Sequence, residues 1–115
     1  MAQRIPTWDD DRPIYRQLAQ KIVSGIIDGT YREGEMLPSV RHLASHYAVN
    51  PLTAARACRE LEEFTEMQRG MGVVVRKGAR NVLLQRERKR FLRDEWPAIR
   101  ERIDALDLDA RKLLK

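Results

Sequence analysis

The sequence predicts a mainly α-helical protein with one small β-hairpin. Apolar residues recur at helical spacing along most of the chain, whereas residues 66–76 combine strand-forming valines with a glycine-rich turn. The 115 residues leave room for one compact domain and an appended element. We expect the compact domain over residues 1–78 and a helical element over residues 79–115.

The charge balance favours an anionic partner, because the formal net charge is +5. Nucleic acid is the commonest such partner for a small soluble protein. The single cysteine, Cys58, cannot form an internal disulfide, so we expect a cytoplasmic location. We expect no membrane partner, since no apolar run approaches the roughly 20 residues that span a bilayer and the start lacks a secretory signal.

A first helix is predicted over residues 13–28. Three aspartates precede Pro13, and both acidic residues and proline are favoured at a helix start. Gly29 and Thr30 then supply a stop. The apolar residues between them recur at helical spacing: Tyr15, Leu18, Ala19, Ile22 and Ile26.

Two short helices follow, joined by a very tight turn. Ser39 caps the first of them, which ends near Tyr47, and Asn50-Pro51 begins the next. This spacing is typical of a helix-turn-helix. The first buries Val40, Leu43, Ala44 and Tyr47, and the second buries Ala54, Ala57, Cys58 and Leu61. The outward or flanking residues of the second are Leu52, Thr53, Ala55, Arg56 and Arg59.

A β-hairpin is predicted next, with strands over residues 66–69 and 73–76 around Gly70-Met71-Gly72. The expected architecture is therefore a winged helix-turn-helix, mainly α with a small β-hairpin.

From Asn81 onward the chain is highly charged and favours helix, with Pro97 interrupting the pattern. Asp107 or Asp109 is expected to cap a last short helix. One apolar seam recurs at coiled-coil spacing: Leu92, Trp96, Ile99, Ile103 and Leu106. This seam packs either on its own domain or, as we favour, in a dimer interface. The predicted tail is therefore a short helical dimerisation element.

Several motifs occur in the order found in GntR-type regulators, and the short tail resembles their YtrA-like subfamily. These motifs are Pro13-Ile14-Tyr15 with Gln17-Leu18, Leu37-Pro38-Ser39 with Arg41, Leu43 and Ala44, Val49-Asn50-Pro51 with Thr53, Arg59-Glu60-Leu61-Glu62, and Arg69-Gly70-Met71-Gly72. The resemblance implies a homodimeric repressor of a two-fold operator, and hints at control of an operon for an ATP-driven exporter. Two recognition helices would then enter major grooves roughly 34 Å apart.

One departure from the family lies between Glu62 and the wing glycines, where this sequence is about two residues shorter than the family pattern. Either the third helix ends early or the first wing strand is truncated.

The residues expected to contact DNA lie on both short helices and in the wing: Ser39, Arg41, Asn50, Leu52, Thr53, Arg56, Arg69 and Gly70. Arg41 is placed there by the resemblance, and a surface ion pair is its alternative. Arg56 is the best candidate for reading a base. Asn50 is a DNA contact or only a helix cap, and Arg69 with Gly70 approaches DNA or only forms a hairpin turn.

No metal site, cofactor or catalytic residue is predicted. His42 and His46 lie four residues apart, but two ligands do not make a site. Cys58 is expected to be a small buried residue rather than a redox sensor. A protein-interaction adaptor that never touches DNA remains the alternative function, and neither an operator sequence nor an effector follows from the residues.

Overall fold

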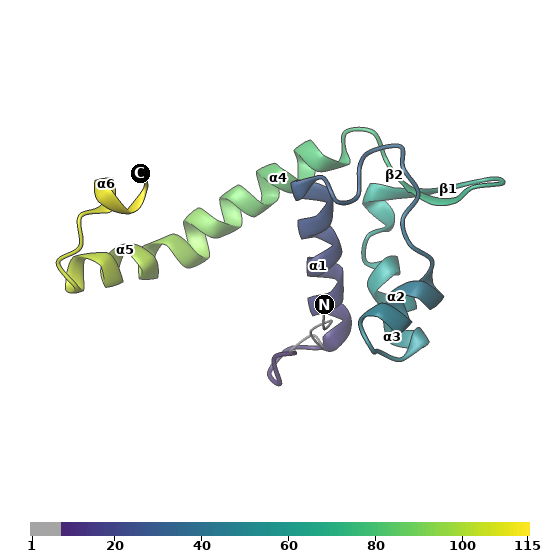
Figure 1. Cartoon of the computed structure of the whole chain (residues 1–115), viewed down its shortest axis with the longest axis horizontal. Coiled ribbons are helices and arrows are strands. Elements are labelled where there is room, and N and C mark those ends of the chain that lie inside the picture. The colour runs from purple at the N-terminus through teal and green to yellow at the C-terminus, as the bar shows by residue number, and fades with distance from the viewer. Residues whose placement is uncertain (1–7) are drawn as a thin grey trace. The chain divides into compact units, whose positions relative to one another are not determined.

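The computed structural model describes residues 8–115 and divides the chain into two compact units, Met1–Asn81 and Val82–Lys115 (Figure 1). The boundary expected between residues 78 and 79 lies at the start of α4. The elements in chain order are α1 (Ile14–Asp28), α2 (Val40–His46), α3 (Pro51–Arg59), a 3-10 turn (Glu62–Phe64), β1 (Thr65–Gln68), β2 (Gly72–Val75), α4 (Ala79–Arg90), a π-helical turn (Phe91–Glu95), α5 (Trp96–Ala105) and α6 (Ala110–Leu113).

Helix α1 has nearly the bounds that the sequence predicts, but it begins differently. Pro13 is the N-cap residue and makes no side-chain capping bond. The buried carboxamide of Gln17 instead holds the preceding segment, since it accepts from the Asp9 N–H at 2.8 Å and donates to the carbonyls of Asp9 and Arg12, each at 2.9 Å. Gly29 ends the helix with φ 91°, a left-handed conformation that glycine adopts without strain.

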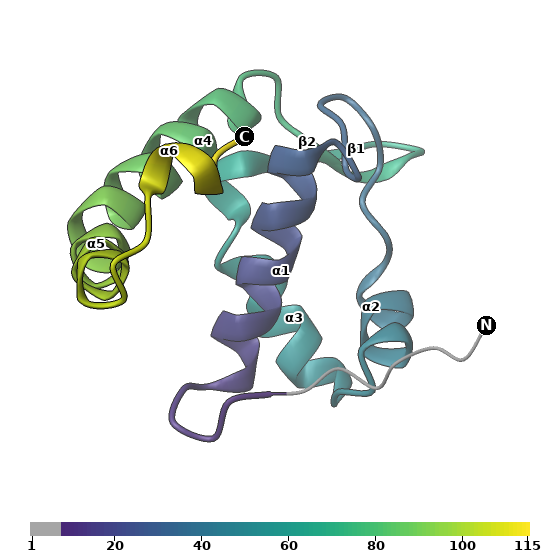
Figure 2. The same ribbon diagram turned by 60° about the vertical axis from the view of Figure 1, so that its left-hand side comes forward.

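The core of the first unit forms where α3 packs against both α1 and α2 (Figure 2). Ala54 and Ala57 of α3 are fully buried, and their small side chains permit close packing of the helices. Three residues that were predicted to be inward are only half-buried: Val40, Tyr47 and Cys58. The largest fully buried side chains are Leu18, Ile22, Ile26, Leu43, Val74 and Val75.

The hairpin differs from the predicted one by one residue. Strands β1 and β2 are antiparallel, with Thr65 opposite Val75 and Gln68 opposite Gly72, so the predicted bounds 66–69 and 73–76 are wrong. Arg69 is needed in the turn rather than in the strand, because the Met71 N–H closes a β-turn on the Gln68 carbonyl at 3.0 Å.

The connection between α1 and α2 pairs with the outer edge of β2. The Gly34 N–H donates to the Val75 carbonyl and the Leu37 N–H to the Val73 carbonyl, both at 2.8 Å. Isolated bridges also link Glu33 to Val75 and Met36 to Val74. This polar connection, which the sequence gives no reason to regard as strand-like, therefore fixes the hairpin to the helical body.

The shortened segment after α3 ends the helix early. The last residue of α3 is Arg59, and the buried Leu61 lies beyond the helix instead of on its inward stripe. The 3-10 turn at Glu62–Phe64 then leads directly into β1, which is as long as β2.

In the second unit, helical structure continues through the position where proline was expected to interrupt it. The Trp96 N–H donates to the Phe91 carbonyl five residues earlier, which makes a π-helical turn just before Pro97. Pro97 lies at the start of α5, directly after this wider turn. The helix therefore widens by one residue before Pro97 instead of ending there.

The chain reverses direction after α5 (Figure 1). Asp107 adopts φ 53° in the reversal, and the Asp109 carboxylate caps α6 by accepting from the Arg111 N–H at 3.0 Å. Of the two aspartates predicted as caps, Asp109 is the one that the structure uses. No helix within residues 8–115 is long and apolar enough to cross a membrane.

Candidate nucleic-acid interface

The turn between α2 and α3 positions the start of α3 at the surface. Ala48 adopts φ 54°, a left-handed conformation uncommon for residues other than glycine, and the Val49 N–H donates to the Ala44 carbonyl at 2.9 Å. These features close the turn within a few residues. The N-terminal turn of α3 is then free to approach a ligand, as it does in helix-turn-helix proteins bound to DNA.

Ser39 and Asn50 both cap helices, as predicted. The Ser39 hydroxyl accepts from the His42 N–H at 3.1 Å, and the Asn50 carbonyl oxygen accepts from the Leu52 N–H at 2.8 Å. Both residues are exposed. Capping uses the Asn50 side-chain oxygen and leaves its NH₂ group as a donor towards solvent.

The exposed part of α3 combines an apolar and a polar side chain. Leu52 is 78% exposed. Thr53, the next residue, is half-buried. A leucine at this place offers an apolar contact of the kind made to a thymine methyl group, and threonine can donate to or accept from a base edge.

Arg56 lies against Tyr15 of α1. Its guanidinium carbon is 3.9 Å from the centre of the Tyr15 ring, and its Nη2 donates to the Tyr15 hydroxyl at 3.3 Å. Arg16 also donates to that hydroxyl, from Nε at 3.1 Å. The sequence predicts Tyr15 only as a buried residue of α1, so its contact with the candidate recognition helix was missed. Its place in the Pro13-Ile14-Tyr15 motif is the one signal that singled it out.

Three further arginines of this unit present unpaired charges to solvent. Arg41, Arg59 and Arg69 are exposed, and within the described part of the chain none of them makes a hydrogen bond or an ion pair. The surface ion pair considered for Arg41 is therefore not formed among residues 8–115. An unpaired guanidinium is suited to grip a phosphate or a guanine edge through two bonds.

The wing turn places Arg69 and Gly70 at an exposed tip. Gly70 adopts φ 83°, and a side chain added there would meet nothing within 4 Å. Glycine is therefore needed for the backbone conformation of the turn, as at the third position of a type II turn, and not for space inside the protein. The structure keeps the predicted hairpin, and Gly70 supplies the left-handed conformation at its turn.

The predicted dimerisation residues form no core within the second unit. No residue from 84 to 115 is buried, and the seam includes Leu92 at 59%, Ile99 at 41% and Leu106 at 51% exposure. Trp96 and Ile103 are half-buried. Apolar side chains at this spacing and exposure typically mark an interaction surface.

The tail carries a dense run of basic residues, all exposed and partly paired with acidic neighbours: Arg86, Arg88, Lys89, Arg90 and Arg93. Arg90 forms an ion pair with Glu87 at 3.9 Å, and Arg93 with Asp94 at 2.7 Å. The bond from Arg93 is also the main cause that lowers the pKa of Asp94. These pairs favour a solvated helix face at their own positions.

The histidines and the cysteine show no ligand-binding cluster. The rings of His42 and His46 are nearly parallel, with centres 6.1 Å apart. Nowhere in residues 8–115 do three or more His, Cys, Asp or Glu side chains gather as metal ligands would. Burial raises the pKa of the half-buried Cys58 thiol, so it stays protonated at neutral pH.

Residues 14–75, from α1 to the end of the wing, match the family described as bacterial regulatory proteins, gntR family. The chain is 32% identical over 100 residues to the HTH-type transcriptional repressor YtrA of Bacillus subtilis (strain 168), a match that covers 85% of this chain and 71% of the relative. The resemblance to YtrA-like regulators that the motifs predict is thereby confirmed.

Two solved structures are similar in fold. A GntR family transcriptional regulator from Listeria monocytogenes is 32% identical, with a TM-score of 0.71 over 93% of this chain and 94% of the other. BusR of S. agalactiae, in complex with its busA-promotor DNA, is 26% identical, with a TM-score of 0.54 over 87% of this chain and 52% of the other. The predicted fold class, a winged helix-turn-helix followed by a helical element, is confirmed.

Proposed function

Because the chain belongs to the gntR family of bacterial regulatory proteins, we propose that it is a repressor that binds a palindromic operator as a homodimer. The general function is that of the family, whose members are non-enzymatic, DNA-binding transcription regulators. The chemistry of the exposed residues on α2, α3 and the wing supports the finer assignment.

One observation carries this proposal: the N-terminal turn of α3 is exposed, and unpaired arginines lie on α2 and in the wing of the same unit. Leu52 projects from that turn, while Arg41 on α2 and Arg69 in the wing present guanidinium groups without partners among residues 8–115. The proposed division of labour follows from the chemistry. Arg41 and Arg69 bind the phosphate backbone, and Leu52, Thr53 and Arg56 contact base edges.

The dimer is proposed from the second unit. Its seam of Leu92, Trp96, Ile99, Ile103 and Leu106 lies on a helical segment without a buried core from residue 84 onward. A second copy of the same seam would cover these side chains. Two-fold pairing would then present two α3 helices to a two-fold operator. We accordingly propose residues 1–78 as the DNA-binding domain and residues 79–115 as the dimerisation element.

A mobility-shift titration of the full chain at increasing salt tests DNA binding through phosphates. The logarithm of the association constant should fall linearly with the logarithm of the salt concentration, and Arg41→Ala should reduce that slope by about 1. Specific binding should survive competitor DNA. Glu35→Ala is the control, because it removes an exposed charge remote from α3 in sequence and should leave the slope unchanged.

The adaptor alternative makes the opposite prediction for the same titration. A winged helix that serves only to bind protein would show weak DNA binding that competitor DNA abolishes. A salt slope that Arg41→Ala leaves unchanged would also contradict the phosphate role proposed for this residue.

The regulated genes are proposed from the resemblance alone. Because this chain resembles YtrA-like regulators, we propose an operon for an ATP-driven exporter as its target. We also propose a cytoplasmic location, since a transcription regulator acts there. Protection of the promoter upstream of such an operon by the purified protein would support the target, and protection only elsewhere would contradict it.

A further inference from the structure

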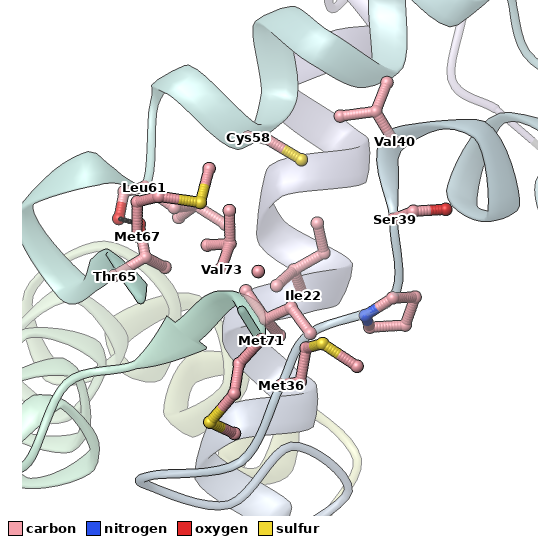
Figure 3. A pocket seen from close by; sticks show the side chains of 13 residues that line it. Ile22, Met36, Ser39, Val40, Cys58, Leu61, Thr65, Met67, Met71 and Val73 are labelled. Carbon is pink, nitrogen blue, oxygen red and sulfur yellow. Dashed lines mark hydrogen bonds between the residues drawn. The ribbon is translucent and has the colours of Figure 1, made fainter. Parts of the chain in front are cut away.

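A pocket of about 520 Å³ lies within the first unit, between α1, the end of α3, the hairpin and the connection before α2 (Figure 3). Its volume falls within the range of roughly 300 to 1,000 Å³ that is usual for small-molecule sites. The walls include Ile22 from α1, Cys58 from α3 and Val73 from β2. Segments that are far apart in the sequence thus line the same pocket.

The lining carries no charged side chain. Its two hydroxyl groups already have partners, since Ser39 accepts from the His42 N–H at 3.1 Å and Thr65 donates to the Leu61 carbonyl at 3.2 Å. Figure 3 shows the Ser39 hydroxyl directed away from the other labelled side chains. The Cys58 thiol is neutral, because burial raises its pKa. An occupant must therefore be uncharged and largely apolar.

Methionine side chains make up much of the pocket lining. The sequence has four methionines, and Met36, Met67 and Met71 all line it. These three residues are 55%, 75% and 50% exposed, so they form a solvent-facing rim of the pocket. Methionine side chains are flexible and polarisable, and they make favourable contacts with aromatic rings. The lining thus favours a ring-bearing ligand over a purely aliphatic one.

The pocket shares its walls with the elements that are proposed to hold DNA. Met67, Met71 and Gly72 belong to the hairpin, and Ser39 caps α2. Gly72 lies close to Met36, since a Cβ added at Gly72 would be 3.1 Å from the Met36 sulfur. A ring inserted here would press on the hairpin from the side that faces the helices.

We propose that this pocket binds a small uncharged aromatic molecule, and that its occupancy displaces the wing and lowers affinity for DNA. The proposal that a ligand binds here rests only on the volume and lining of the pocket. The effect on DNA rests on the function proposed above, because it requires that the wing contact DNA.

Binding is tested with N-phenyl-1-naphthylamine, an uncharged aromatic probe whose fluorescence rises in apolar surroundings. The full chain should give a saturable increase. In protein labelled with methyl-¹³C methionine, the signals of Met36, Met67 and Met71 should shift together. The signals are assigned by single Met→Leu substitutions. Saturable fluorescence without shifts at these three methionines would overturn the site.

Charged variants at the pocket rim separate pocket binding from general adsorption. Met67→Glu and Met71→Glu change exposed side chains, so the fold should survive, as circular dichroism will show. Each should weaken probe binding about tenfold or more, since an apolar ligand would have to bury a carboxylate. Gln68→Glu is the matched control, because Gln68 is the next residue of the same strand and does not line the pocket. Equal affinity in all three variants would contradict the proposal.

The effect on DNA is measured as a mobility shift with and without saturating probe. Weaker DNA binding in the wild type but not in Met67→Glu supports the coupling, and identical binding with and without probe overturns it. A protein that binds no DNA under any condition would contradict the proposed function, while the probe titration would still decide whether the pocket is a site.

Discussion

The guanidinium carbon of Arg56 lies 3.9 Å from the centre of the Tyr15 ring, and the same arginine donates to the Tyr15 hydroxyl. This contact joins α3 to α1 at the surface proposed to meet DNA. It restricts a side chain that would otherwise sample many rotamers. Tyr15 is itself buried at 9% exposure, so it offers Arg56 a fixed support.

Arg56→Ala should weaken operator binding by about 1 to 3 kcal/mol if Arg56 reads a base. Tyr15→Phe keeps the ring beneath the guanidinium and removes only the hydroxyl, so it should have a smaller effect. Both are measured by mobility-shift titration against one operator fragment. Unchanged binding by Arg56→Ala would remove this residue from the interface, and an equal loss in Tyr15→Phe would show that the hydroxyl, not the ring, matters.

Ile99→Asp combined with Ile103→Asp should yield monomers, because two carboxylates would have to be buried in the proposed dimer seam. Sedimentation equilibrium measures the mass of the double variant. Ala98→Asp combined with Ala105→Asp is the matched control, since it adds the same charge to exposed positions of α5 outside the seam. A dimer that persists in the double isoleucine variant would place the interface elsewhere.

Gly25→Ala should destabilise the protein by about 1 to 3 kcal/mol, although alanine is normally the better helix former. The reason is steric, because an added Cβ would lie 2.6 Å from two carbons of the Tyr31 ring. The Tyr31 backbone is held in place by the bond from its N–H to the Gly25 carbonyl at 3.0 Å. Urea unfolding measures the change, with the exposed neighbour Ser24→Ala as control. Greater stability of Gly25→Ala would contradict the predicted clash.

Stability should fall in acid partly through Glu33. Backbone N–H groups of Gly78 and Arg80 lower the pKa of its carboxyl, and the bond from Arg80 measures 3.0 Å. Because the folded pKa is the lower one, this stabilisation is complete above the unfolded value of about 4.3 and is lost as pH falls through the folded value.

Glu33→Gln should therefore lower stability at neutral pH and flatten its dependence on pH in the acid range. Urea midpoints between about pH 6 and pH 3 measure both effects. Glu35→Gln is the control, since within residues 8–115 the Glu35 side chain makes no hydrogen bond or ion pair. An unchanged pH profile in Glu33→Gln would show that this carboxylate does not stabilise the start of α4.

Helix boundaries were predictable where local chemistry determines them. Ser39, Asn50 and Asp109 cap helices through their own side chains, and Gly29 ends α1 by its conformation. These signals depend on a few neighbouring residues. The sequence therefore contains them in full.

The features that sequence reasoning missed depend on distant contacts. The pairing of the connection before α2 with β2 requires tertiary packing, as does the contact between Arg56 and Tyr15. The π-helical turn before Pro97 accommodates a residue that local propensity treats as a helix breaker. The pocket beside the wing forms only when four segments meet, so no single segment predicts it.

Selection of bound fragments from random DNA by the purified full chain tests the central claim most directly. The account predicts a recovered palindrome whose half-sites are centred about one helical turn apart, roughly 34 Å, and weaker recovery with Arg56→Ala. Recovery of no preferred sequence, or of a single site without two-fold symmetry, would contradict operator recognition by a paired α3.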